Sequence, residues 1–130
     1  GEEITVDVFC NSVSKPLVIS PRIRLAVKSG QTVKGETIDS VRFIDAVQKI
    51  CGLVQMKGVC NIQFFLSKGQ LIFLEINPRF AAGGLMLTVA AGANIPLLVL
   101  KSILNFDVDE VECQVKKGLK MTRYWEEIII

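Results

Sequence analysis

The polar side chains best placed for chemistry lie on two consecutive strands joined by a Ser-Lys-Gly turn, a pattern typical of a β-hairpin. Side chains alternate along a strand, so Asn61 and Gln63 share one face of the first strand. Glu75 and Asn77 share one face of the second strand for the same reason. If Gln63 pairs opposite Glu75, the two asparagines also fall opposite each other, and four oxygen-bearing side chains converge. The turn length leaves this register open, and a shift of one residue would separate the group.

Carboxylate and amide oxygens suit a hard cation such as Mg²⁺ or Mn²⁺, which takes its remaining ligands from water and nucleotide phosphates. Pro78 cannot donate to the ladder of a sheet, so Arg79 lies where the second strand ends, beside the same patch. A guanidinium group there can neutralise charge on a phosphoryl group during its transfer. The spacing favours a metal and phosphate site, although an ordinary hairpin with a polar outer face carries the same pattern.

A second group of cations shares the polar face of another predicted strand, residues 17–28. It consists of Arg22, Arg24 and Lys28. Guanidinium groups in this arrangement suit contact with a phosphate of a nucleotide cofactor or with a substrate carboxylate, and we favour Arg22 and Arg24 over Lys28. A solvated basic face is the alternative interpretation.

Hydrophobic periodicity predicts the elements that must position these residues. The predicted strands are 4–8, 17–28, 59–66, 70–76 and 119–130, and the predicted helices are 40–54, 84–91 and 96–105. Residues 29–39 are predicted to form a loop because Ser-Gly and Lys-Gly pairs punctuate them. This order of elements predicts an α+β fold with a mixed, mainly antiparallel β-sheet backed by helices.

Composition excludes several mechanisms. The 130 residues contain no histidine, which excludes Ser-His-Asp catalysis, Cys-His catalysis and histidine-ligated zinc. The four cysteines are scattered, with no Cys-x-x-Cys pair and no signal segment, and they fit reduced core residues of a cytoplasmic protein. A net charge of +2 is too small to indicate nucleic-acid binding.

The uncharged run from Phe80 to Leu100 has about the length needed to span a bilayer. A Gly-Gly pair near its start and a Gly-Ala-Asn-Ile-Pro segment in its middle interrupt the run, so we interpret it as two short buried helices without membrane contact. The mean hydropathy of +0.43 is high for a free-standing domain. We therefore expect apolar surface that packs against another part of the protein.

Three segments together carry a family resemblance: the strand Asn61–Phe64, the motif Glu75–Arg79, and the Gly-Gly and Ala-Gly-Ala-Asn segments that follow. They resemble the C-terminal half of an ATP-grasp domain, of the type found in the large subunit of carbamoyl phosphate synthetase. The opening strand Glu3–Val8 is similar to the strand that begins this half. The similarity covers nearly the whole chain, and it implies that residues 1–130 form a partial ATP-grasp domain.

The resemblance implies a set of roles. Glu75 and Asn77 would ligate Mg²⁺, and Gln63 would be a further metal ligand. Arg79 would contact the transferred γ-phosphoryl group, and Glu3 would bind the nucleotide ribose. Enzymes of this family use ATP to convert a small carboxylate into an acyl phosphate, which an amine or ammonia then attacks. A glutamine at position 63, where many members carry an acid, favours the carbamoyl phosphate synthetase branch.

The sequence also departs from the family pattern. It has no glycine-rich loop followed by Lys-Ser or Lys-Thr to cover the phosphates. We therefore expect the N-terminal part of the fold, from the same protein, to be a missing partner. We also expect the chain alone to be inactive. The sequence leaves open whether the protein forms a homo-oligomer. Two alternatives stay open as well. One is a non-catalytic ATP-grasp relative that acts as a regulatory or subunit-contact module. The other is an unrelated α+β domain whose hairpin mimics the motif.

Overall fold

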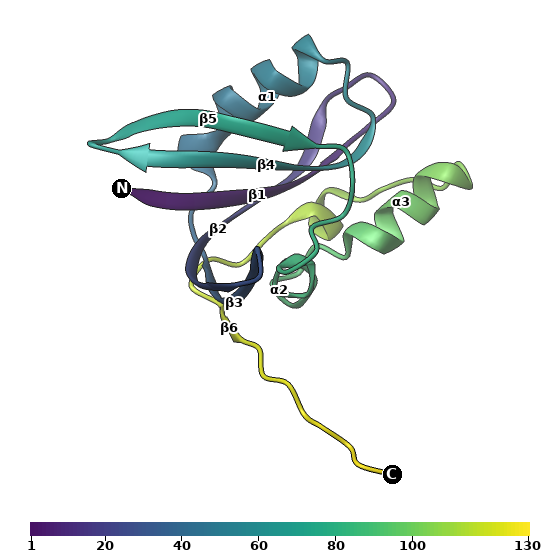
Figure 1. The fold of residues 1–130 in the computed structure, drawn as a ribbon. Helices are drawn as coiled ribbons and strands as arrows, with labels where there is room; N and C mark the ends of the chain where they lie inside the picture. The colour runs from purple at the N-terminus through teal and green to yellow at the C-terminus, as the bar shows by residue number, and fades with distance from the viewer.

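Six strands form one sheet in the computed structural model of the chain, which describes residues 1–130 (Figure 1). Their order is β5-β4-β1-β2-β3-β6, and each neighbouring pair is antiparallel. The strands are β1 (Glu2–Cys10), β2 (Pro16–Lys28), β3 (Gln31–Thr37), β4 (Gly58–Ser67), β5 (Gln70–Asn77) and β6 (Lys120–Thr122). The helices are η1 (Val41–Phe43), α1 (Ile44–Leu53), α2 (Leu85–Ala90), α3 (Ile95–Ile103) and η2 (Glu110–Cys113). The predicted α+β class is confirmed.

One face of the sheet packs against α1 and holds the larger part of the core. Ile4, Val6 and Val8 of β1 are at most 1% exposed, as the period of two predicts. Val47 and Cys51 of α1 pack with them in a cluster of ten buried residues. Because neighbouring side chains of β1 point to opposite faces, this packing leaves the polar residues of β1 on the other face.

The opposite face is partly covered by α2 and α3 (Figure 1). Ile95 and Leu98 of α3 pack with Phe9 and Val18 in a second cluster of five buried residues. Gly92 lies between the two helices with φ of 127°, a conformation that favours glycine. The uncharged run therefore forms two short helices, as predicted, and no helix has the length and apolar character needed to cross a membrane.

Three of the four cysteines, Cys10, Cys51 and Cys60, are free thiols buried in the core cluster under α1. Hydrogen bonding to Cys51 and burial raise the pKa of Cys10 and of Cys60 above that of a free thiol. Both thiols are therefore protonated and serve as small core residues.

Two predictions at the other edge of the sheet are wrong. Residues 31–37 form β3 instead of a loop, because the turn at Ser29 and Gly30 returns the chain antiparallel to β2. The buried residues of β3 include Thr32 and Thr37. Because these residues are polar, the alternation of buried and exposed positions in β3 does not appear as a hydrophobic pattern in the sequence. The final strand is limited to Lys120–Thr122, since β6 pairs only with Lys34–Glu36.

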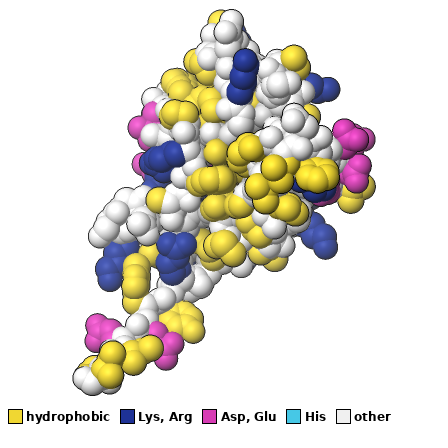
Figure 2. Space-filling model, turned by 90° about the vertical axis from the view of Figure 1, so that its right-hand side faces the viewer, with side chains coloured by type: hydrophobic (Ala, Val, Ile, Leu, Met, Phe, Trp, Pro, Cys, Tyr) yellow, Lys and Arg dark blue, Asp and Glu magenta, His cyan; other side chains and the backbone are white.

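Large hydrophobic side chains gather over the middle of the face that carries α3 (Figure 2). Leu97, Leu100, Ile103, Leu104 and Phe106 are between 42% and 70% exposed. This exposure accounts for part of the high mean hydropathy of the chain.

Candidate functional site

The register of the β4–β5 hairpin agrees with the one that the chemistry requires. Asn61 lies opposite Asn77, and Gln63 lies opposite Glu75. Directly opposed residues project from the same face of an antiparallel pair, so the four side chains share one face. Within β5, Asn77 Nδ2 donates a hydrogen bond of 2.8 Å to Glu75 Oε1. The structure therefore brings together the residues that the sequence predicts as metal ligands.

A register shift follows Gln63, and it leaves Leu74 out of the pairing between β4 and β5. Leu74 is 48% exposed, so it does not enter the core. A bulge inserts one extra residue and re-aims the side chains beside it. Here the extra residue lies next to Glu75 and separates the polar end of the hairpin from its apolar tip.

Asn61 has a different role from the other three hairpin residues. It is 4% exposed, and its Nδ2 donates to Asp7 Oδ1 at 2.9 Å. The candidate metal ligands that remain accessible are Gln63 and Asn77, which are half-buried, and Glu75, which is exposed. No group of three His, Cys, Asp or Glu side chains forms a metal cluster, so a cation here would rely on one carboxylate and amide oxygens.

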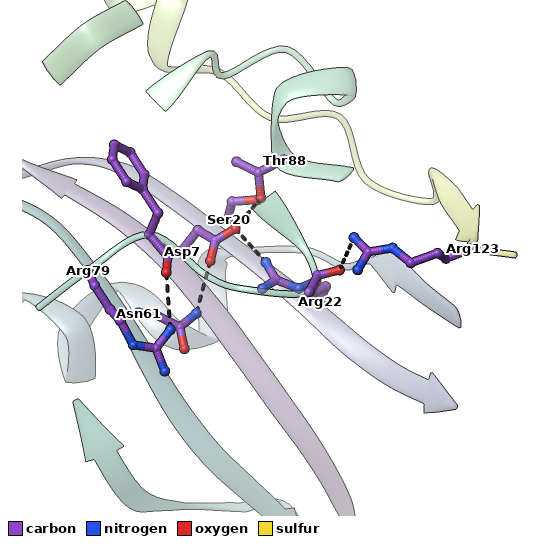
Figure 3. Close-up of polar contacts among 9 residues, drawn as sticks. Asp7, Ser20, Arg22, Asn61, Arg79, Thr88 and Arg123 are labelled. Carbon is purple, nitrogen blue, oxygen red and sulfur yellow. Dashed lines mark hydrogen bonds and ion pairs between the residues drawn. The ribbon is translucent and has the colours of Figure 1, made fainter. Parts of the chain in front are cut away.

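Beside the hairpin, on the neighbouring strand β1, the carboxylate of Asp7 is the centre of a buried hydrogen-bond network (Figure 3). Its Oδ2 accepts from Arg22 Nη1 at 2.5 Å and from Thr88 Oγ1 at 2.7 Å. Thr88 also shares a hydrogen bond of 2.9 Å with Ser20 Oγ. Together with Asn61, these residues tie β1, β2, β4 and α2 into one unit. We call this group, Asp7, Ser20, Arg22, Asn61 and Thr88, the Asp7 network.

Gly83 and Gly84 lie where the loop before α2 passes close to the sheet. A Cβ atom on Gly84 would overlap the guanidinium group of Arg22, and one on Gly83 would meet the backbone nitrogen of Thr32. Arg123, from the C-terminal segment, donates from Nη2 to the carbonyl oxygen of Gly83 at 3.1 Å (Figure 3). Glycine at these two positions therefore lets the loop before α2 approach the polar face of the sheet.

Arg24 and Glu3, both predicted as nucleotide contacts, pair with each other. Arg24 Nη1 lies 2.9 Å from Glu3 Oε2, and Arg24 Nη2 donates to the carbonyl oxygen of Gly30 at 3.0 Å. The side chain of Arg24 is 11% exposed and that of Glu3 is 52% exposed. Arg24 thus holds a carboxylate that remains open to solvent.

Arg79 lies at the end of β5, as predicted, and its side chain is exposed. Its Nη1 donates to the carbonyl oxygen of Phe80 at 3.1 Å, and it forms no ion pair. With Arg22, Arg24 and Gln63 it lines a cavity of about 50 Å³ bounded on one side by Gly83 and Gly84. We call this space the arginine cavity.

Sequence reasoning missed Asp7, Thr88 and Arg123 as parts of this region. Asp7 lies between two apolar residues of β1, and a carboxylate in that position was the feature of the sequence that could have indicated its role. Thr88 and Arg123 gave none, since the contacts they make lie 81 and 40 residues away along the chain.

The arrangement of sheet, hairpin and overlying loop defines an ATP-grasp fold. Biotin carboxylase from Campylobacter jejuni, solved as a complex with β,γ-ATP, matches it with a TM-score of 0.70 at 16% identity, over 92% of this chain and 28% of that one. Urea carboxylase from Kluyveromyces lactis matches with a TM-score of 0.70 at 14% identity, over 92% of this chain and 11% of that one. At such low identities these likenesses concern the fold.

A family model described as "ATP-grasp in the biosynthetic pathway with Ter operon" matches residues 1–126, and the chain belongs to this ATP-grasp family. The carbamoyl phosphate synthase large chain of Methanothermobacter thermautotrophicus is 29% identical over 85% of this chain and 10% of its own length. The arginine-specific large chain of Geobacillus stearothermophilus is 24% identical over 95% of this chain and 13% of its own. The chain thus spans about a tenth of the length of these relatives.

Proposed function

We propose that the chain is the ATP- and Mg²⁺-binding half of a ligase that activates a carboxylate as an acyl phosphate, as in carbamoyl phosphate synthetase. An amine or ammonia then attacks the acyl phosphate and displaces phosphate. The observation that carries this proposal is the hairpin register, which gathers Gln63, Glu75 and Asn77 on one face. Arg79 and the arginine cavity adjoin that face. Membership of the ATP-grasp family supports the same chemistry.

The donor set fits Mg²⁺. Glu75 offers a carboxylate, while Gln63 and Asn77 offer amide oxygens, and hard cations prefer such ligands. Glu75 forms no ion pair, and the amide nitrogen of Asn77 donates to it, which leaves the amide oxygen of Asn77 free. Bound Mg²⁺, or Mn²⁺ in its place, supplies positive charge for the phosphate oxygens of ATP.

The protein side chains have separate roles in this proposal. Arg79, which carries an unpaired positive charge, stabilises the charge on the transferred γ-phosphoryl group. Glu3 accepts hydrogen bonds from the ribose hydroxyls of ATP, and Arg24 holds its carboxylate in place. Arg22 is fixed by its ion pair with Asp7 and lines the arginine cavity.

We also propose that residues 1–130 act as the C-terminal subdomain of the ATP-grasp fold, with the half that covers the nucleotide supplied by another segment. The sequence has no glycine-rich loop followed by Lys-Ser or Lys-Thr. The exposed apolar side chains on the face of α3 offer surface for packing (Figure 2). The free cysteines suit a cytoplasmic setting. The isolated chain is then inactive as a ligase, and sustained ATP turnover by it would contradict this.

Binding of Mn²⁺ and ATP to the 130-residue chain tests the metal role without requiring turnover. Paramagnetic broadening in NMR spectra should be strongest for the signals of Gln63, Glu75 and Asn77. Glu75→Gln removes the only carboxylate of the set, so it should weaken Mn²⁺ binding at least about tenfold while the fold survives. Glu110→Gln is the matched control, because Glu110 is exposed and outside the site.

Equal broadening in the wild-type protein and the Glu75→Gln variant would contradict the proposed role of Glu75 as a metal ligand. Metal and nucleotide binding with no ligase activity, after the other half of the fold is supplied, would favour the non-catalytic alternative. In that case the chain would serve as a regulatory or subunit-contact module.

A further inference from the structure

The loop that joins β5 to α2, residues 78–84, forms one wall of the arginine cavity, and few hydrogen bonds hold it there. Arg79 and Gly83 both line the cavity. No backbone–backbone hydrogen bond involves residues 80–83. Arg79 Nη1 donates to the carbonyl oxygen of Phe80, and Arg123 Nη2 donates to that of Gly83, at 3.1 Å in each case. Only the second of these bonds comes from outside the loop.

Arg123 is carried to this loop by the sheet. It directly follows β6, which pairs with β3, and its backbone nitrogen donates to the carbonyl oxygen of Val33 at 2.7 Å. Two residues further on, the ring centroid of Trp125 lies 4.4 Å from Lys28 Nζ, and this cation–π contact ties the same segment to the end of β2. The side chain of Arg123 therefore starts from a fixed backbone position.

The guanidinium group of Arg123 bridges β3 and the loop. Its Nη1 donates to Gln31 Oε1 at 3.3 Å, while its Nη2 holds the carbonyl oxygen of Gly83. Arg123 forms no ion pair, so both donors are used on neutral oxygens. Gly83 is buried, and a buried carbonyl group without a donor is costly. Loss of Arg123 should therefore shift the loop away from the sheet, toward water.

We propose that Arg123 is a positioning residue for the candidate site: it holds the loop against the sheet and thereby sets the direction of Arg79. The two arginines are linked through the loop, because the Phe80 carbonyl oxygen that orients Arg79 belongs to the backbone that Arg123 fixes at Gly83. This inference rests on the proposed ligase function, in which Arg79 stabilises the transferred phosphoryl group. It adds a residue that acts on the site without lining the arginine cavity itself.

Arg123→Gln in the 130-residue chain is the first test, with NMR relaxation as the readout. Arg123 is half-buried and forms no ion pair, so this variant is expected to fold. The order parameters of the backbone amides of residues 81–83 should fall from about 0.85 to below about 0.6, while those of β4 and β5 stay unchanged. The Nε–H signal of Arg79 should shift as its bond to Phe80 is lost. Arg42→Gln is the matched control, because it removes the same charge at an exposed residue without an ion pair.

Binding of Mn²⁺ and ATP separates positioning of the site from general support of the fold. Affinity for Mn²⁺ alone should be the same in the wild-type protein and in Arg123→Gln, because the proposed ligands Gln63, Glu75 and Asn77 lie on the hairpin. Affinity for ATP in the presence of Mn²⁺ should fall about five- to tenfold, because Arg79 is then correctly placed in only a fraction of the molecules. Arg123→Lys keeps the charge and can reach one of the two acceptors, so it should restore part of the loss.

The outcomes separate this proposal from the broader one. Unchanged order parameters in residues 81–83 would overturn the role of Arg123, and so would an equal loss of order in β4 and β5, which would indicate general support of the fold. Loss of loop order with unchanged ATP affinity would also overturn it. Failure of the wild-type protein to bind Mn²⁺ and ATP would instead contradict the ligase function. The loop order parameters and the Arg79 signal, which need no ligand, would then still decide whether Arg123 positions Arg79.

Discussion

The Asp7 network and the neighbouring end of the hairpin share one face of the sheet but differ in how their polar groups are used. In the network, Asp7 is 1% exposed, and both of its carboxylate oxygens accept hydrogen bonds from protein groups. At the hairpin end, Glu75 and Arg79 are exposed and form no ion pair. The buried group is satisfied internally and fixes the strands, while the exposed group keeps its capacity for a ligand.

Under the proposed function, this difference separates stability from binding on a single sheet face. A buried charge must be paired, since removing its partner leaves an uncompensated charge in a poorly solvated place. An exposed carboxylate has water as an alternative partner, and its substitution changes stability little. Substitutions in the two regions should therefore have opposite consequences, and this expectation can be tested from the largest effect downward.

The largest effect is expected for Asp7→Ala. It leaves the Arg22 guanidinium buried without its acidic partner and removes the acceptor for Thr88 and Asn61. The free energy of unfolding should fall by about 3–5 kcal/mol, measured by urea denaturation. As a control, Lys117→Ala removes an ion pair whose side chains are 72% and 55% exposed, and it should leave the denaturation midpoint almost unchanged.

Asp7→Leu combined with Arg22→Met sharpens this test, because the double variant removes both buried charges. It should be clearly more stable than Asp7→Ala, since no charge is left without a partner. A double variant that is as unstable as the single one would show that packing around Asp7, and not its charge, dominates.

Gly84→Ala should have the next largest effect. The added Cβ would overlap the Arg22 guanidinium, so the loop before α2 must move away from the sheet. We expect a loss of about 1–3 kcal/mol in the free energy of unfolding, together with faster amide exchange in α2. Gly52→Ala is the control, because nothing lies within 4 Å of a Cβ there and it occupies an exposed helical position. It should stabilise the chain by about 0.5–1 kcal/mol. A neutral Gly84→Ala would mean that the close approach is not required.

The sequence predicted the hairpin and the polar side chains that share its face because that information is local. Gln63 and Glu75 stand twelve positions apart around a tight turn, and alternation then decides which side chains share a face. The class of fold followed from the same periodicities. What alternation does not specify is the register, and only the structure shows the pairing of Gln63 with Glu75 and the extra residue at Leu74.

The Asp7 network was not predictable in the same way, because its members are brought together by tertiary contacts. Thr88 lies in a helix whose neighbours are apolar, and its partner Asp7 is 81 residues distant. Arg22 was predicted to contact a ligand, and the sequence gave no indication that Asp7 would hold it. The strand β3 was missed for a related reason: its inward residues are threonine and glycine, which carry no hydrophobic period.

The smallest effect on stability is expected for Gln63→Glu, at the polar end of the hairpin, where Gln63 lies opposite Glu75. Gln63 is half-buried and makes no side-chain hydrogen bond within the protein, so stability should change by less than about 0.5 kcal/mol. Affinity for Mn²⁺ should instead rise severalfold, because a second carboxylate adds charge to the ligand set. Gln70→Glu, an exposed position at the start of β5, is the matched control and should not alter Mn²⁺ binding. If Gln63→Glu destabilised the fold as strongly as Asp7→Ala, or left Mn²⁺ affinity unchanged, the division of this face into a structural region and a binding region would be wrong.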